Sequence, residues 1–129
     1  MGQQQLLLII LGVIIVGIAI AVGLSLFSAQ SVQSNKDAMI NDINNLAANA
    51  YQYYIRPTSM GGGGGTFAGY AVPYKMSSND NATYVGTPSG TASCSFTGTS
   101  HTNSGTVTGV VDNTGKVTFG SGAFTGDFQ

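Results

Sequence analysis

The side chains that most often carry enzyme chemistry are almost absent from this sequence. It has one His, His101, one Cys, Cys94, and no Glu among its five acidic residues. His101 lies in a polar stretch without a nearby carboxylate or Cys cluster, so it fits neither a catalytic triad nor a metal site. Cys94 lies between two serines in an alternating segment, which favours a small buried apolar residue over a nucleophile. We therefore expect no enzymatic activity, no cofactor and no metal.

Three other polar or glycine-rich motifs have limited chemical meaning. Asp80 has Asn on both sides, but the ligand count and spacing of a calcium loop are missing, and turn formation explains the cluster. Asn81-Ala82-Thr83 matches the acceptor pattern for N-glycosylation, which makes Asn81 a candidate modification site. The five glycines at 61–65 have no Lys-Ser/Thr behind them, so they do not form a phosphate loop. We expect a flexible hinge or an extended loop there.

Charged residues are scarce and unevenly placed. Only 7% of the 129 residues are charged and the formal net charge is −1, whereas roughly 25% is usual in soluble domains. No basic patch indicates nucleic acid as a partner. The first charged side chain is Lys36. The 35 residues before Lys36 therefore contain no charged side chain.

Residues 6–27 form an apolar segment of membrane length. They include no charged side chain and nothing more polar than Ser25. As a helix, the segment would rise about 33 Å, which matches a hydrocarbon core of about 30 Å. A cleaved secretory signal would have a shorter apolar region behind a basic start, and Met1-Gly2-Gln3-Gln4-Gln5 has no Lys or Arg. The segment can span a bilayer.

Three glycines, Gly12, Gly17 and Gly23, interrupt this segment. Each weakens a helix by about 1 kcal/mol relative to Ala. They can allow close approach of neighbouring helices, although their spacing is not that of GxxxG. They can equally mark a stretch that unwinds locally, or be ordinary glycines of a membrane helix.

An amphipathic helix is predicted over residues 32–55. Its apolar positions recur at helical spacing, and Pro57 sets its end. Ser34 could cap a fresh helix, which would place a kink near Asn35. An unbroken helix of roughly 50 residues, about 75–80 Å long, is the alternative. The residues expected to pack against the rest of the chain are Met39, Ile43, Leu46, Ala50 and Tyr54.

The C-terminal part reads as a small β-rich head. Gly, Ser and Thr make up half of residues 57–129, but short apolar alternations recur between turn signals. The clearest is a hairpin, with strands at 106–111 and 116–119 around the turn 112–115. Residues 82–85 and 92–97 are further strand candidates, and 66–72 a weaker one. We expect three to five antiparallel strands packed on the 39–55 half-helix.

Together these features predict an α+β chain. A long N-terminal helix covers residues 1–56, with an apolar half at 6–27 and an amphipathic half at 32–55. A Gly-rich loop follows at 57–66, and a β-rich head with an antiparallel sheet at 67–129. A head this poor in large apolar side chains needs the half-helix to complete its core.

This layout resembles the type IV pilins and the related pseudopilins. The likeness rests on the apolar block at 6–27, its amphipathic continuation, the Tyr-rich helix end Tyr51-Gln52-Tyr53-Tyr54 and the small β-rich head. The resemblance implies an apolar half-helix held in the inner membrane before assembly and then bundled with identical subunits in an extracellular filament, with help from pilus assembly machinery. It also makes Gly12 and Gly17 the expected sites of helix melting, with Gly23 a further point of close approach. The expected packing residues are Met1, Gln3, Gln4, Gln5, Leu6, Leu7, Ile10, Val13 and Ile14.

The N-terminus departs from that family. Its members usually carry a Glu at the fifth mature position. If Met1 is the first mature residue, that position is Gln5; cleavage after Gly2 would make it Leu7. Two other functions stay open: a single-pass membrane-anchored binding module at the cell surface, and a pseudopilin of a secretion system.

Overall fold

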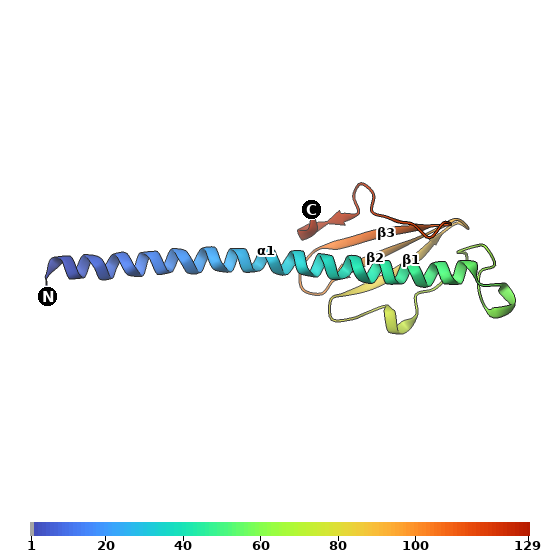
Figure 1. Cartoon of the computed structure of the whole chain (residues 1–129), viewed down its shortest axis with the longest axis horizontal. Helices are drawn as coiled ribbons and strands as arrows, with labels where there is room; N and C mark the ends of the chain where they lie inside the picture. Colours follow the sequence, from blue (N-terminus) through green and yellow to red (C-terminus); the bar gives the residue numbers. More distant parts are fainter. Residues whose placement is uncertain (1) are drawn as a thin grey trace. The chain divides into compact units, whose positions relative to one another are not determined.

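The structure, a computed structural model, describes residues 2–129, so Met1 and the packing role expected for it lie outside the described residues (Figure 1). One long helix, α1 (Gln3–Ile55), precedes a five-stranded antiparallel sheet. The α+β prediction is confirmed. The strands are β1 (Ala82–Ser89), β2 (Ser93–Ser100), β3 (Thr106–Asp112), β4 (Val117–Thr118) and β5 (Phe124–Thr125). Three short 3₁₀ helices are η1 (Thr58–Met60), η2 (Tyr74–Met76) and η3 (Gly126–Phe128).

Helix α1 runs without a break through Asn35, so the fresh helix start considered at Ser34 is wrong. Ser34 stays helical and exposed, whereas the Asn35 side chain is buried and serves as a polar anchor. Its Oδ1 accepts hydrogen bonds from Ser100 Oγ at 2.7 Å and Asn103 Nδ2 at 3.2 Å, and its Nδ2 donates to the Asn81 carbonyl at 3.3 Å. The residue next to the expected cap therefore fixes the helix to the end of β2 and to two loops of the sheet.

The chain divides into two compact units, Met1–Val32 and Gln33–Gln129. The second, called here the compact unit, contains the second half of α1 together with the whole sheet. Its strands follow the order β1-β2-β3-β4, and β5 pairs with the other end of β3. The α1 residues of this unit lie across one face of the sheet (Figure 1). No α-helix of the described residues covers the opposite face.

The core of the compact unit lies between α1 and the sheet. Met39, Ile43 and Leu46 from the helix are at most 1% exposed, as are Phe96 and Val107 from the strands. Burial of each such side chain stabilises the fold by about 1.5–3 kcal/mol. The helical spacing of the apolar residues between 39 and 50 therefore reflects the side of α1 that packs on the sheet.

Two glycines in the central strands allow the helix to come this close. A Cβ at Gly109 would lie 2.8 Å from Ile43 Cγ2, and one at Gly98 would lie 2.7 Å from the Tyr84 ring. Such distances are too short for real contacts, so larger residues would push the helix and strands apart. Glycine in these strands is a packing requirement.

The predicted hairpin turn is present between β3 and β4. Asp112 Oδ1 accepts bonds from Thr114 N at 2.9 Å and Lys116 N at 3.0 Å, and Gly115 has a φ of 84°. The hydrogen bond from the Thr114 hydroxyl, followed by the two backbone donors, lowers the pKa of Asp112. Strand β4 is shorter than expected, with two residues only.

The glycine run 61–65 is neither a hinge nor an extended loop, because it caps the end of α1. Gly63 N donates to the Tyr53 carbonyl at 2.8 Å, Gly65 N to that of Tyr54 at 2.8 Å and Gly64 N to that of Arg56 at 2.9 Å. These bonds satisfy carbonyls that a helix end leaves without partners. Gly63 is buried, and a Cβ there would lie 2.0 Å from the Thr66 carbonyl oxygen.

The weaker strand expected at 66–72 is also wrong. This segment is a loop that turns at Gly69, where φ is 83°, and Tyr70 N donates to the Phe67 carbonyl. Phe67 and Tyr70 are both buried, with rings near Tyr54 and Phe96. Their apolar spacing therefore comes from a turn that inserts two aromatic rings into the core.

The free edge of the sheet is protected along β1. Near its start, Tyr84 N donates outwards to the Ser77 carbonyl, away from β2. Pro88 lies four residues after Tyr84, so its backbone nitrogen also faces away from β2. Because proline has no N–H, it cannot donate a hydrogen bond to a further strand. The other edge consists of the two-residue strands β4 and β5. Short edges and proline discourage pairing with another sheet.

Candidate assembly segment and head pocket

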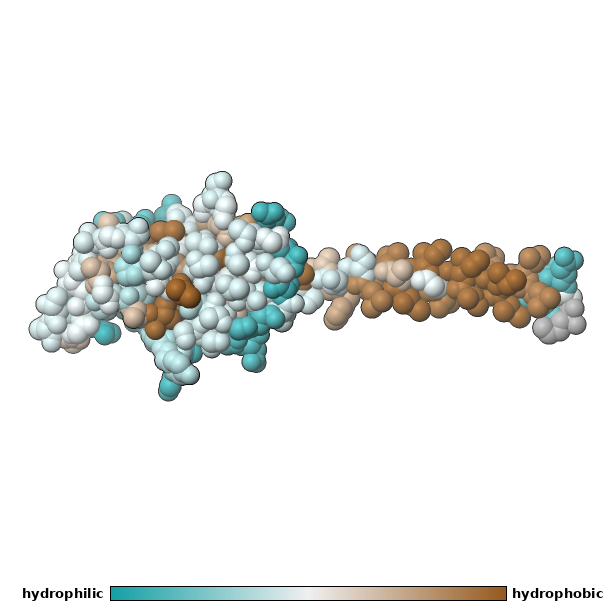
Figure 2. All heavy atoms as spheres, turned by 180° about the vertical axis from the view of Figure 1, so that it is seen from behind, coloured by the Kyte–Doolittle hydropathy of each residue, from teal (hydrophilic) through white to brown (hydrophobic). Residues whose placement is uncertain are grey.

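The apolar segment, residues 6–27, is the most unusual surface of the described chain. Sixteen large apolar side chains between Leu6 and Phe27 each leave more than half of their surface exposed. They surround the helix on all sides, and Figure 2 shows the segment almost uniformly brown. A helix that is apolar all round is stable only in a membrane or in the core of a larger assembly.

By length and composition, α1 can cross a membrane, with a mean hydropathy of 3.2 in its most apolar window and none of that window buried. The chain therefore has a surface that lipid or other helices must cover. It is the one helix among the described residues with this property.

The residues assigned to assembly all belong to this exposed part of α1. Gln3, Gln4 and Gln5 form its first turn, and Leu6, Leu7, Ile10, Val13 and Ile14 follow, all exposed. Gly12, Gly17 and Gly23 are helical, and a Cβ at any of them would meet nothing within 4 Å. Among residues 2–129, no side chain therefore requires a glycine at these positions. Melting of the helix at Gly12 and Gly17 stays a prediction for the assembled state.

The residues assigned to packing between helix and head lie in the other half of α1. Met39, Ile43, Leu46 and Ala50 are buried against the sheet. Tyr54 is half-buried, and its ring lies 4.7 Å from that of Phe67. One helix therefore carries an unpartnered half and a packed half.

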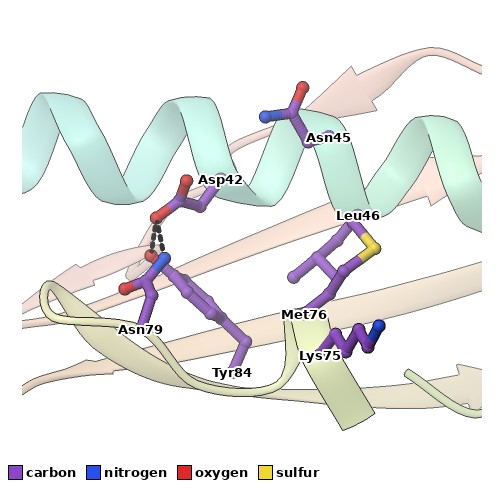
Figure 3. Close-up of a pocket in the computed structure, with 7 residues that line it drawn as sticks. All are labelled: Asp42, Asn45, Leu46, Lys75, Met76, Asn79 and Tyr84. Atoms are coloured by element: carbon purple, nitrogen blue, oxygen red, sulfur yellow. Dashed lines mark hydrogen bonds between the residues drawn. The ribbon is translucent and has the colours of Figure 1, made fainter. Parts of the chain in front are cut away.

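A small polar pocket opens beside the packed half of α1 (Figure 3). Its volume is about 160 Å³, and its lining residues are Asp42, Asn45, Leu46, Lys75, Met76, Asn79 and Tyr84. At its centre, Asp42 Oδ2 accepts two hydrogen bonds, from the Tyr84 hydroxyl at 2.5 Å and from Asn79 Nδ2 at 2.8 Å. Burial, and then the hydrogen bond to Asp42, raises the pKa of Tyr84.

This pocket joins three elements and offers little chemistry. Asp42 comes from α1, Asn79 from the loop before β1 and Tyr84 from β1, so one carboxylate oxygen ties the helix to the sheet. The pocket has no His, Cys or second carboxylate in its lining, and no acid–base pair forms there. Asp42 and Tyr84 were not identified from the sequence, because 42 residues separate them and neither belongs to a motif.

The other candidate residues have ordinary environments. His101 is exposed, with Nε2 3.1 Å from the Thr83 hydroxyl, and Cys94 is fully buried. Burial raises the pKa of the Cys94 thiol to about 11, so it is protonated and unreactive at neutral pH. Asn79 Oδ1 accepts from the N–H groups of Asn81 and Ala82, which makes the cluster around Asp80 a turn. Asn81 itself is half-buried. Over residues 2–129, no group of three His, Cys, Asp or Glu could hold a metal.

Comparison with protein-family models, with curated proteins and with solved structures returns no significant match. What the structure itself defines is an architecture: a long apolar N-terminal helix followed by a small antiparallel sheet. That architecture is compatible with a pilin-like fold.

Proposed function

We propose that this protein is a structural subunit of a type IV pilus-like helical filament. In this filament, the apolar segments of identical subunits bundle in the core and the sheets face outwards. The observation that carries the proposal is an apolar helix surface exposed along all of residues 6–27, in a chain whose second unit folds compactly. Repetition of one such contact from subunit to subunit extends a polymer without closure.

The glycines favour helices over lipid as the final partner of the apolar segment. A Cβ at Gly12, Gly17 or Gly23 would meet nothing within 4 Å, yet together these glycines cost the helix about 3 kcal/mol relative to Ala. Lipid gains nothing from a missing side chain, whereas a neighbouring helix can approach more closely at a glycine. Identical neighbours in a filament would supply this packing.

The charge distribution also suits close packing of copies. Six charged residues lie beyond Asp42, three of each sign, so their formal charges cancel. They are Arg56, Lys75, Asp80, Asp112, Lys116 and Asp127. Identical surfaces with little net charge repel one another weakly. The precursor would lie in the membrane through residues 6–27, and assembly machinery would extract it into an extracellular filament.

Substitution of Gly17 separates the filament from a plain membrane anchor. Gly17→Leu adds a large apolar side chain to the segment, so it strengthens insertion into lipid but blocks close helix approach. For a filament subunit we expect at least a tenfold loss of sheared extracellular fibres while the membrane-bound pool is kept. Val16→Leu is the matched control, because Val16 is already large, and it should leave the fibre yield within twofold.

Two results would count against the filament. One is a wild-type protein found only in membranes and never in sheared fibres, which favours the single-pass anchored module. The other is a cryo-electron microscopy map of the fibres without a central bundle of this apolar segment. A very low abundance of fibres, together with a phenotype in protein secretion, would favour the pseudopilin function.

A further inference from the structure

Asn81 is the one asparagine of this sequence that lies in an N-glycosylation pattern. The sequence has nine asparagines, and only Asn81 is followed two residues later by a Ser or Thr, Thr83, with a residue other than proline between them. A three-residue pattern often arises by chance, so the structure around Asn81 decides whether its side chain can carry a sugar.

The backbone of Asn81 is fixed by hydrogen bonds to three other residues. Its N–H donates to Asn79 Oδ1 at 2.8 Å, which closes a turn just before β1. Its carbonyl accepts hydrogen bonds from Asn35 Nδ2 at 3.3 Å and from the N–H of His101 at 3.2 Å. The turn is therefore tied to α1 and to the loop after β2, and the Cα that bears the Asn81 side chain has a fixed place in the compact unit.

The carboxamide of Asn81, by contrast, is open to solvent. In the partly and fully buried residues of 2–129, every buried side-chain nitrogen or oxygen atom has a hydrogen-bond partner. Within the same range the Asn81 carboxamide makes no hydrogen bond, so its Nδ2 and Oδ1 atoms are not buried, although the residue as a whole is only partly exposed. The carboxamides of Asn35 and Asn79 are instead bonded, the latter to Asp42 (Figure 3). The folded unit therefore accommodates a substituent on Asn81 Nδ2.

The hydroxyl residue of the pattern also lies at the surface. Thr83 is exposed, and its hydroxyl lies 3.1 Å from Nε2 of His101, which is exposed as well. Ala82, between Asn81 and Thr83, is fully buried and keeps the start of β1 in the core. Amide and hydroxyl are thus presented together at the point where an ordered turn enters a strand.

We propose that Asn81 Nδ2 carries an N-linked oligosaccharide in the mature protein. The donor is an oligosaccharide joined through phosphate to a membrane lipid. In the transfer, a bond forms between Asn81 Nδ2 and C1 of the first sugar, and the C1–O bond to phosphate breaks. The electron pair of that bond leaves with the lipid phosphate, and one amide proton goes to a base of the transferase. This chain supplies only the acceptor.

This inference goes beyond the proposed filament and does not depend on it. It requires only that the compact unit crosses the membrane in which α1 can be held and in which a lipid-linked donor lies. A membrane-anchored module would carry the same glycan, so the two proposals can fail separately. A glycan would add hydration to a chain with only 7% charged residues.

The test is mass spectrometry of the full-length protein, purified from the cells that produce it. The intact mass of most molecules should exceed the sequence mass by that of an oligosaccharide. Cleavage after Lys75 and Lys116 releases residues 76–116, and electron-transfer fragmentation of this peptide should place the added mass on Asn81. Asn81→Gln should lose it completely. Asn113→Gln is the matched control, because Asn113 is an exposed turn asparagine of the same peptide without a hydroxyl residue two positions later.

Two substitutions of Thr83 test recognition of the hydroxyl. Thr83→Ser should keep the glycan, whereas Thr83→Ala should reduce the glycosylated fraction at least tenfold. A thermal melt followed by circular dichroism checks that the variants are folded, and Asn81→Gln should be, because the Asn81 carboxamide makes no hydrogen bond within residues 2–129. An unmodified Asn81 in the wild type would overturn the proposal. So would sugar found only on Ser or Thr of the peptide, or equal glycosylation of Thr83→Ser and Thr83→Ala.

Discussion

The two halves of α1 have opposite surroundings although they belong to one unbroken helix. Before Val32, every described residue is exposed, including sixteen large apolar side chains. From Gln33 onwards, six residues are buried, and they recur at intervals of three and four, as one face of a helix requires. The first half is apolar on all sides, and the second half on one side only.

The difference shows where the chain completes its own fold and where it does not. The second half needs apolar residues on one side only, because the sheet covers that side. The first half needs to be covered on all sides, and the described residues do not cover it. Two substitutions of the same kind in the two halves should therefore affect different properties.

The largest effect is expected from a carboxylate placed in the packed half. Ile43→Asp would bury a charge without a partner at a position with no exposed surface, at a cost of about 4 kcal/mol or more, so the compact unit should unfold. Ile14→Asp, in the apolar segment, should leave its thermal unfolding unchanged while abolishing membrane insertion and fibre formation. Equal loss of folding in both variants, measured by near-ultraviolet circular dichroism, would contradict the division into two halves.

The glycine cap at the end of α1 comes next. Gly63→Ala would force a Cβ against the Thr66 carbonyl and the Tyr53 ring, so we expect a loss of about 2–3 kcal/mol. Gly120→Ala is the matched control, because a Cβ there meets nothing within 4 Å, and its effect should stay within about 0.5 kcal/mol. Urea unfolding of the two variants makes the comparison. If Gly63→Ala is as stable as the control, the glycine run 61–65 does not stabilise the end of α1.

Loss of the polar anchor, Asn35, at the start of the packed half should reduce the free energy of unfolding by a smaller amount. Asn35→Ala removes three hydrogen bonds and leaves Ser100 without its partner on the helix, which costs about 1–3 kcal/mol. Hydrogen exchange should show faster opening around residues 100–103. The matched control is Gln33→Ala, which removes one exposed bond to Asp37 and should cost less than about 0.5 kcal/mol.

The smallest effect at neutral pH is expected for Tyr84→Phe, which removes the bond to Asp42 at about 1 kcal/mol. The pH dependence is more informative. The pKa of Tyr84 is raised in the folded state, so its contribution is complete below about pH 10, the unfolded value, and is lost as the pH rises further. The pKa of Tyr70 is raised to about 12, chiefly by burial and then by Cys94, so it acts in the same direction.

Stability should therefore fall above about pH 9, where the unfolded Cys94 thiol begins to ionise ahead of the folded one. Tyr84→Phe should flatten the decline above pH 10 while keeping the part due to Cys94. Chemical unfolding at pH 8, 9, 10 and 11 measures both slopes. An identical decline in wild type and variant would show that Tyr84 does not keep its proton in the folded state.

Local patterns predicted the features that depend on neighbouring residues. The apolar length at 6–27, the helical stripe from Met39 to Ala50 and the hairpin turn closed by Gly115 all follow from spacing and turn chemistry within a few residues. The features that could not be predicted depend on distant contacts. Ser34 has the residue type of a helix cap, but α1 continues through it, and the neighbouring Asn35 amide is bonded to residues 46 and 65 positions away.

The two loop errors have the same origin. A glycine run has no side chains to indicate order, and its role became visible only with the helix carbonyls that it caps. Residues 66–72 alternate as a strand would, but Phe67 and Tyr70 are buried from a turn. The pocket around Asp42 likewise exists only after folding brings α1 and β1 together.

Pro88 has a consequence for how crowded subunits behave. Any assembly of this protein concentrates many copies of one sheet, and exposed strand edges at high local concentration are templates for amyloid-like growth. The missing N–H of Pro88, near the end of β1, interrupts the hydrogen-bond ladder that such growth needs. In any assembly formed through the helices, this edge of the sheet would therefore be poorly suited to the addition of a further strand.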